Sequence, residues 1–141
     1  MSADDNKALI RRWIEAYNDR DEQAEADARA PDYVAHVPGG PGPLNSEQWT
    51  QFLAGFSEGF PDLRLTPQEV LAEGDMVAVR VDFDGIHAGR FAGVPPTHKR
   101  VAFSSIEINR IVDGKVVEHW VQLDRLEVLQ QLGVAPSEPN A

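Results

Sequence analysis

The apolar residues of this chain change their spacing once, near Leu63, and this change limits the folds that the chain can adopt. Before Leu63, large apolar side chains recur every three or four residues, as on one face of a helix. After Leu63 they alternate with polar residues, as in strands that are buried on one side. Because the helices come first and the strands follow, the order indicates an α+β domain with helices packed on one face of an antiparallel sheet.

The same patterns place the individual elements. We predict helices at about 5–19, at about 22–30, from Asn45 or Ser46 to Phe60, and at 125–132. We predict strands at about 33–37, 63–72, 76–86, 99–111 and 116–124. Ser2 and Asp5 can form a capping box before the first helix, and Asp124 is more typical of the N-cap of the last helix than of a catalytic acid. We expect one domain over residues 1–134 and a loose tail over 135–141.

Composition excludes several classes of function. A chain of 141 residues can bury one core, and a formal charge of −10 without a Lys/Arg stripe disfavours nucleic acid and anionic lipid as partners. The absence of cysteine excludes disulfides, thiolate metal sites and cysteine nucleophiles. No apolar run is long enough to cross a bilayer, and the acidic N-terminus is unlike a secretory signal, so we expect a cytoplasmic protein without a membrane partner.

A set of short segments gives the chain a family resemblance. In chain order they are Phe60-Pro61-Asp62-Leu63, Glu73-Gly74-Asp75, Gly85-Ile86-His87-Ala88-Gly89, Gly93-Val94-Pro95-Pro96-Thr97, Arg110-Ile111-Val112-Asp113-Gly114-Lys115, Glu118-His119-Trp120 and Gln131-Leu132-Gly133. Together they resemble the SnoaL-like polyketide cyclase family over residues 6–134. The resemblance implies the cone-shaped α+β barrel of nuclear transport factor 2-like proteins, usually dimeric, with a ligand cavity between the curved antiparallel sheet and the N-terminal helices.

The family includes cyclases that close polyketide rings by intramolecular aldol chemistry, and also isomerases, dehydratases, epoxide hydrolases and binding proteins. In the cyclases that this sequence resembles, the last strand carries a catalytic Asp and the preceding strand a partner His. Aligned on the Arg110 to Lys115 turn, these positions hold Val121 and Glu107. Since valine cannot move a proton, the family's acid/base assignment does not carry over to this chain.

The register of the last hairpin decides which side chains meet Glu107. A three-residue turn with Gly114 left-handed places Glu107 opposite His119, whereas a two-residue turn places it opposite Trp120. We favour the first register, which gathers Ser105, Glu107, Asn109 and His119 into a polar patch on an apolar surface. We therefore hypothesise that Glu107 is the catalytic acid or base and that His119 orients it. The alternative is an ordinary cross-strand pair at a sheet face or dimer contact.

The expected ligand contacts lie around this pair. They are Trp13, Tyr17, His36, Trp49, Phe56, Phe60, His87, Ser105, Asn109 and Val121. Among them His36 could equally lie on the surface, and His87 could instead fix the turn between Gly85 and Gly89. The aromatic residues favour a flat or polycyclic apolar ligand that carries a few oxygens.

The leading functional hypothesis is cofactor-free and metal-free acid/base catalysis on an apolar, polyketide-like carbonyl compound, by a cyclase or isomerase that forms a homodimer. No histidine pair has the spacing of a metal site. The first alternative, which Val121 favours, is a small-molecule binding protein that lost the cyclase acid. The second is an epoxide hydrolase, which needs paired acids facing the cavity.

Overall fold

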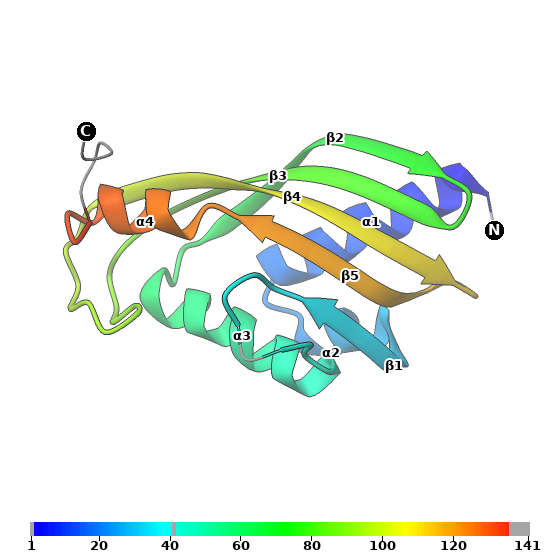
Figure 1. Ribbon diagram of the computed structural model, residues 1–141, viewed down its shortest axis with the longest axis horizontal. Coiled ribbons are helices and arrows are strands. Elements are labelled where there is room, and N and C mark those ends of the chain that lie inside the picture. Colours follow the sequence, from blue (N-terminus) through cyan, green and yellow to red (C-terminus); the bar gives the residue numbers. More distant parts are fainter. Residues whose placement is uncertain (1, 41, 136–141) are drawn as a thin grey trace.

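The computed structural model describes residues 2–40 and 42–135 (Figure 1). Its elements are α1 (Ala3–Asn18), α2 (Glu22–Asp27), β1 (Arg29–His36), α3 (Ser46–Gly59), β2 (Arg64–Glu73), β3 (Met76–Ile86), β4 (Arg100–Val112), β5 (Lys115–Leu123) and α4 (Arg125–Gln131). The predicted α+β class and element order are confirmed. The expected tail lies outside the described residues, apart from residue 135.

The sheet has the strand order β1-β5-β4-β3-β2. Four strands are antiparallel, but β1 runs parallel to β5, so the prediction of a wholly antiparallel sheet was wrong for this edge. A parallel pair needs a long crossover connection, and here the chain passes through α3 and the other strands before it returns beside β1. Register shifts in three of the four strand pairs accompany the curvature, and β1 and β2 stay apart as open edges rather than closing a barrel.

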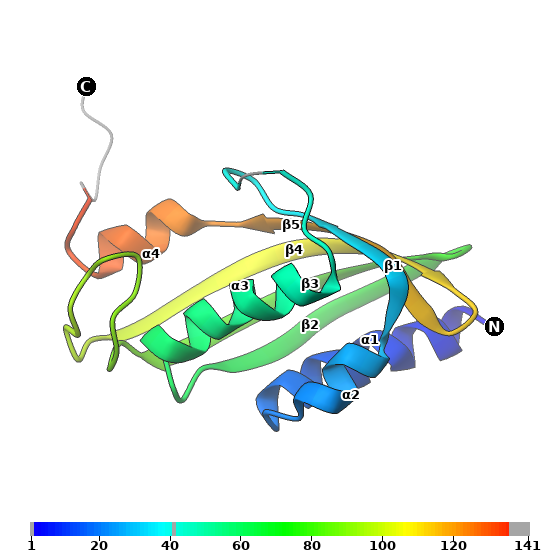
Figure 2. The ribbon, with the colours of Figure 1, turned by 90° about the horizontal axis from the view of Figure 1, so that it is seen from below.

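Helices α1, α2 and α3 lie across one face of this curved sheet (Figure 2). The predicted capping box of Ser2 with Asp5 begins α1, and Asn45 with Gln48 forms a second one at the start of α3. Each box satisfies backbone N–H groups that would otherwise lack a partner. The apolar sides of α1 and α3 face the sheet, and this layer of side chains contains the site described below.

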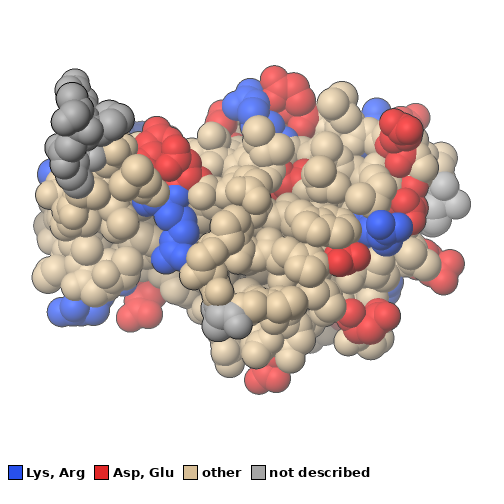
Figure 3. Space-filling model, in the orientation of Figure 1, with Lys and Arg blue, Asp and Glu red and all other residues tan. Residues whose placement is uncertain are grey.

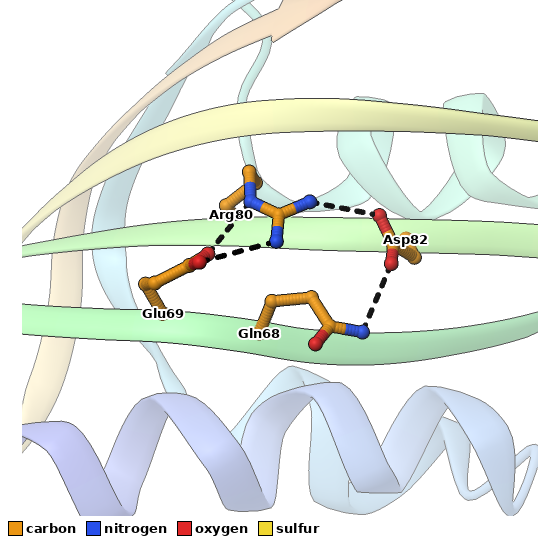
Figure 4. Close-up of polar contacts among 4 residues, drawn as sticks. All are labelled: Gln68, Glu69, Arg80 and Asp82. Carbon is orange, nitrogen blue, oxygen red and sulfur yellow. Dashed lines mark hydrogen bonds and ion pairs between the residues drawn. The ribbon is translucent and has the colours of Figure 1, made fainter.

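The outer face of the sheet carries a cluster of polar side chains on β2 and β3. Arg80 donates to Glu69 (Nε to Oε2, 2.6 Å) and to Asp82 (Nη1 to Oδ1, 3.2 Å), while Gln68 donates to Asp82 (Figure 4). Such exposed pairs contribute roughly 0–1 kcal/mol each. On the face drawn in Figure 3, basic side chains lie in separate groups with acidic ones beside them. Within the described residues, no helix combines the length and apolar character that a membrane crossing requires.

Candidate active site

The hairpin between β4 and β5 positions the central acidic residue. Asp113 and Gly114 both have positive φ (50° and 73°), and Val112 pairs with Lys115, which is the two-residue turn that suits a hairpin. A register shift follows at once, so that Glu107 lies opposite Val121 and His119 lies opposite Asn109. The predicted three-residue turn, and the opposition of Glu107 and His119 that it implied, were therefore wrong.

The bulge preserves the face on which these side chains lie. A two-residue turn alone would have placed Glu107 opposite Trp120, and the extra residue that the bulge adds to β5 moves the pairing on by one position. Side chains alternate along a strand, so Glu107, His119 and Val121 share the face that the helices cover. Glu107 consequently reaches His119 along the diagonal instead of straight across.

Four side chains form one hydrogen-bonded chain on that face. Glu107 Oε1 lies 2.5 Å from His119 Nε2, and its Oε2 accepts from Ser105 Oγ at 2.5 Å. His119 Nδ1 lies 3.0 Å from the Tyr33 hydroxyl. Burial raises the pKa of Tyr33, and neighbouring Glu107 raises it further although Arg29 opposes this, so the phenol stays protonated and can donate to Nδ1. This assigns the His119 proton to Nε2, where it is donated to the Glu107 carboxylate.

The side chains at the centre of this hydrogen-bonded group are almost fully shielded from solvent. The His119 side chain is 1% exposed and that of Glu107 is 13% exposed. Two indole rings pack against the imidazole in T-shaped pairs, with ring centroids 5.2 Å away for Trp13 and 4.9 Å away for Trp49. A carboxylate that keeps both hydrogen bonds but is largely removed from water is a suitable general base for a weakly acidic C–H group.

Glu107 and His119 open onto a chamber between the sheet and the helices, with a volume of about 50 Å³. Its lining consists of Trp13, Ile14, Tyr17, Glu25, Trp49, Phe52, Leu53, Phe56, Leu65, Phe83, Glu107, His119, Val121 and Leu123. Among the predicted ligand contacts, this set includes Trp13, Tyr17, Trp49, Phe56 and Val121. Apart from two carboxyls and a few ring or hydroxyl groups, the wall is apolar.

The other predicted contacts lie outside the chamber wall. Phe60 is fully buried against His87, while Ser105 and Asn109 are buried behind the wall, where Ser105 reaches the site only through Glu107. His87 Nδ1 accepts from the Thr97 backbone N–H at 3.1 Å, which fits the alternative role of fixing the turn. His36 is on the opposite face of the sheet, 2.7 Å from Glu118, which fits the surface alternative rather than the ligand contact. Asp124 caps α4, as predicted.

The indole N–H of Trp49 is an uncommitted donor beside the pair. Trp49 is 5% exposed, and its Nε1 atom is enclosed without a hydrogen-bond partner among the described residues. Buried Trp N–H groups usually have an acceptor, because leaving one unpaired costs about 1–3 kcal/mol. A ligand oxygen could supply this missing acceptor within the chamber.

Two residues of the site, Tyr33 and Glu25, were not predicted from the sequence. Tyr33 meets His119 only because β1 pairs with β5, a contact that no local pattern encodes. Glu25 lies on α2, a polar helix whose sequence is typical of a solvated surface, yet this residue is half-buried and lines the chamber. Burial raises the pKa of Glu25 to about 7, with Arg29 as the main opposing influence.

The raised pKa of Glu25 predicts a pH-dependent stability. Since the folded state holds this proton more tightly than the unfolded chain, Glu25 makes unfolding easier as the pH rises from about 4.5 through about 7. We expect Glu25→Gln to increase the free energy of unfolding at pH 8 by about 1–2 kcal/mol, discounted for partial solvent access, and by less at pH 5.5. Urea unfolding at both pH values measures this. Glu15→Gln, on the exposed side of α1, is the control, and a gain for Glu25→Gln that is equal at the two pH values would contradict the prediction.

The acidic and histidine side chains of the described residues do not form a metal site. Across residues 2–40 and 42–135, no group of three or more His, Asp or Glu side chains is close enough together to hold a metal ion. Glu107 and His119 are a pair, and they are already engaged with each other. That the chain works without a metal or cofactor stays a prediction.

Comparisons with known proteins agree with the geometry. A family model described as SnoaL-like polyketide cyclase matches residues 7–132. The aklanonic acid methyl ester cyclase DnrD of Streptomyces peucetius is 32% identical over 133 residues, which cover 89% of this chain and 88% of that protein. The crystal structure of AclR, a candidate hydroxylase from Streptomyces galilaeus, is 35% identical with a TM-score of 0.89, covering 98% of this chain and 87% of AclR. IdmH, a candidate polyketide cyclase from Streptomyces antibioticus, is 34% identical with a TM-score of 0.84, covering 92% and 99%.

Proposed function

This chain belongs to the SnoaL-like polyketide cyclase family, and we propose that it closes a ring in an apolar, polyketide-like carbonyl compound by acid/base catalysis without a cofactor. The observation that carries the proposal is the buried pair of Glu107 and His119 at the wall of an apolar chamber. Glu107 is the base, and His119 holds its carboxylate in place.

The reaction that suits this site is an intramolecular aldol addition. Glu107 removes a proton from the carbon next to a carbonyl group, and the resulting enolate attacks a second carbonyl of the same molecule. Negative charge develops on the carbonyl oxygen, where the N–H of Trp49, which has no hydrogen-bond partner among the described residues, can stabilise it. Glu107 then returns its proton to the new alkoxide, so the product has the same atoms as the substrate.

The remaining contacts position the base. Ser105 and His119 each donate to one carboxylate oxygen, which fixes the plane of the carboxyl group. Tyr33 keeps the His119 proton on Nε2 by donating to Nδ1. Val121, where the resemblance implies a catalytic Asp, lies directly opposite Glu107. We infer that Glu107 takes over the proton transfer for which the family uses that Asp.

Incubation with aklanonic acid methyl ester, the compound named for the relative DnrD, tests the proposal. Chromatography with mass detection should reveal a new isomer of unchanged mass, which heat-denatured protein does not produce. Absence of turnover with measurable binding would instead support the alternative of a binding protein. A product that gains one water would favour epoxide hydrolysis, for which Glu25 and Glu107 both line the chamber.

Hydroxylation is a second candidate, favoured by the similarity to AclR over nearly the whole chain. Val121 is compatible with hydroxylation, because the Asp that the resemblance implies at this position is the proton carrier of the aldol cyclases. This reaction would add one oxygen atom to the product and would require oxygen and a reductant in the assay. The same mass measurement, run with and without them, distinguishes it from ring closure.

We also propose that the protein forms a homodimer through the outer face of its sheet. Paired positions on that face form one row across all strands, namely Leu71, Ala78, Ile108, Trp120 and His36. Leu71 on the edge strand β2 is 68% exposed, and Ile108 on the central strand β4 is 41% exposed, so this row leaves large apolar side chains open to solvent. Sedimentation equilibrium that gives only the monomer mass at high micromolar concentration would contradict the proposal. The expected cytoplasmic location stays a prediction.

A further inference from the structure

A second hollow lies next to the chamber, on the other side of two phenylalanines. It has a volume of about 360 Å³ and lies between the second half of α3, the loop between β3 and β4, and the start of α4. Its lining consists of Phe52, Gly55, Phe56, Glu58, Arg90, Phe91, Ala92, Gly93 and Arg125. Phe52 and Phe56 also line the chamber, so these two rings separate the outer groove from Glu107 and His119.

The chamber alone is small for the proposed substrate. Pockets for small organic ligands usually have about 300–1,000 Å³, several times the volume beside Glu107. The outer groove reaches this range. Phe52 is only half-buried, and its ring lines both the chamber and the groove, so the two spaces adjoin at this side chain.

Gly55 is a feature of the groove that the protein's own packing does not explain. It lies inside α3, where glycine is less favourable than alanine by about 0.5–1 kcal/mol. A Cβ atom at Gly55 would meet no described atom within 4 Å, whereas one at Gly59 would come within 2.6 Å of Phe91. Gly59 is therefore needed for packing against the loop, while the missing side chain at Gly55 leaves space in the groove.

The groove also carries positive charge. Arg90 and Arg125 both belong to its lining, with Glu58 as the single acid. Arg90 donates to the Gly93 carbonyl at 2.9 Å, which holds its side chain along the loop. Within the described part of the chain, neither guanidinium lies within 4.0 Å of a carboxylate. Two cations that have no carboxylate partner among the described residues and lie beside an apolar wall, in a chain of charge −10, suit an apolar ligand with an anionic group.

We propose that this groove is an outer subsite that binds the distal end of the substrate, and that this end carries a carboxylate or another anionic group. The inference rests on the proposed function, because it assigns the reacting end of the same molecule to the chamber. Phe52 and Phe56 contact the middle of the ligand, Gly55 gives it room, and Arg90 and Arg125 bind the anionic group.

Binding of a tricyclic probe tests the subsite without requiring turnover. Anthraquinone-2-carboxylate and its uncharged amide can be titrated against the protein by isothermal calorimetry. We expect the carboxylate to bind about tenfold more tightly than the amide, and this preference to disappear when Arg90 and Arg125 are both changed to Gln. Equal affinities for the two probes, or an unchanged preference in the double variant, would overturn the anionic subsite.

A steric variant tests the place of binding. Gly55→Leu fills the groove and should weaken probe binding at least tenfold, whereas Gln51→Leu, one turn earlier on the exposed side of α3, should leave it unchanged. Gly55→Ala should bind nearly as well as the wild type and melt at a higher temperature. Unchanged binding by a folded Gly55→Leu would overturn the proposal. If these results hold while no ring closure is found, the subsite stands and the proposed function fails.

Discussion

Glu107→Gln is expected to lower turnover of aklanonic acid methyl ester by about 10²- to 10⁴-fold, the usual contribution of a positioned general base. The amide has nearly the same shape as the carboxyl group, and its oxygen can still accept from His119 Nε2. Its nitrogen faces the Ser105 hydroxyl, which can rotate to accept. Stability should therefore change little, while the ability to remove a proton is lost. Single-turnover kinetics and a thermal melt of the same preparation measure the two effects.

The same substitution on the other face of the hairpin provides the control. Glu118 pairs with His36 at 2.7 Å, outside the chamber, so Glu118→Gln removes a carboxylate from the same strand pair without touching the site. It should keep full activity. If Glu107→Gln also keeps full activity, Glu107 has no part in the mechanism and the proposed chemistry fails.

The fold could be predicted from the sequence because its elements are encoded locally. The spacing of Trp13 and Tyr17 on α1, the capping residue Asn45 and the alternation along β4 each determine an element without help from distant contacts. The family resemblance then supplied their arrangement. The parallel pairing of β1 was not predicted, because strand order depends on contacts between residues far apart in sequence.

The site shows where local patterns stop being sufficient. The register of Glu107 depends on a turn and a bulge whose backbone angles the residues Asp113-Gly114 permit but do not require. The face was nevertheless predicted correctly, since the bulge restored the alternation that the two-residue turn would have broken. Glu25 could not be predicted in this way, because a residue of a polar helix becomes half-buried only when other elements pack over it.

The direct opposition of Glu107 and Val121 leads to the second large prediction. Side chains opposite each other in an antiparallel pair have Cβ atoms about 4.5–5.5 Å apart, and Val121 is 3% exposed. Val121→Asp would place a second carboxylate beside the first in a nearly dry environment. We expect it to lower the free energy of unfolding by about 3–5 kcal/mol at pH 8, measured by urea denaturation. Val121→Asn, of similar shape but uncharged, should lose less, and the difference isolates the charge.

Adding Glu107→His to Val121→Asp should recover part of that loss. The double variant carries the His and Asp that the family resemblance implies at these positions, so repulsion between two acids becomes attraction between an imidazolium and a carboxylate. Contacting residues typically couple by about 0.5–3 kcal/mol, and we expect a favourable coupling in this range that grows from pH 8 to pH 6 as the imidazole gains its proton. Additive losses for the two substitutions would mean that positions 107 and 121 do not sense each other's charge. Glu107 could then not be regarded as the replacement for the family's acid, because the two positions would not share one electrostatic environment.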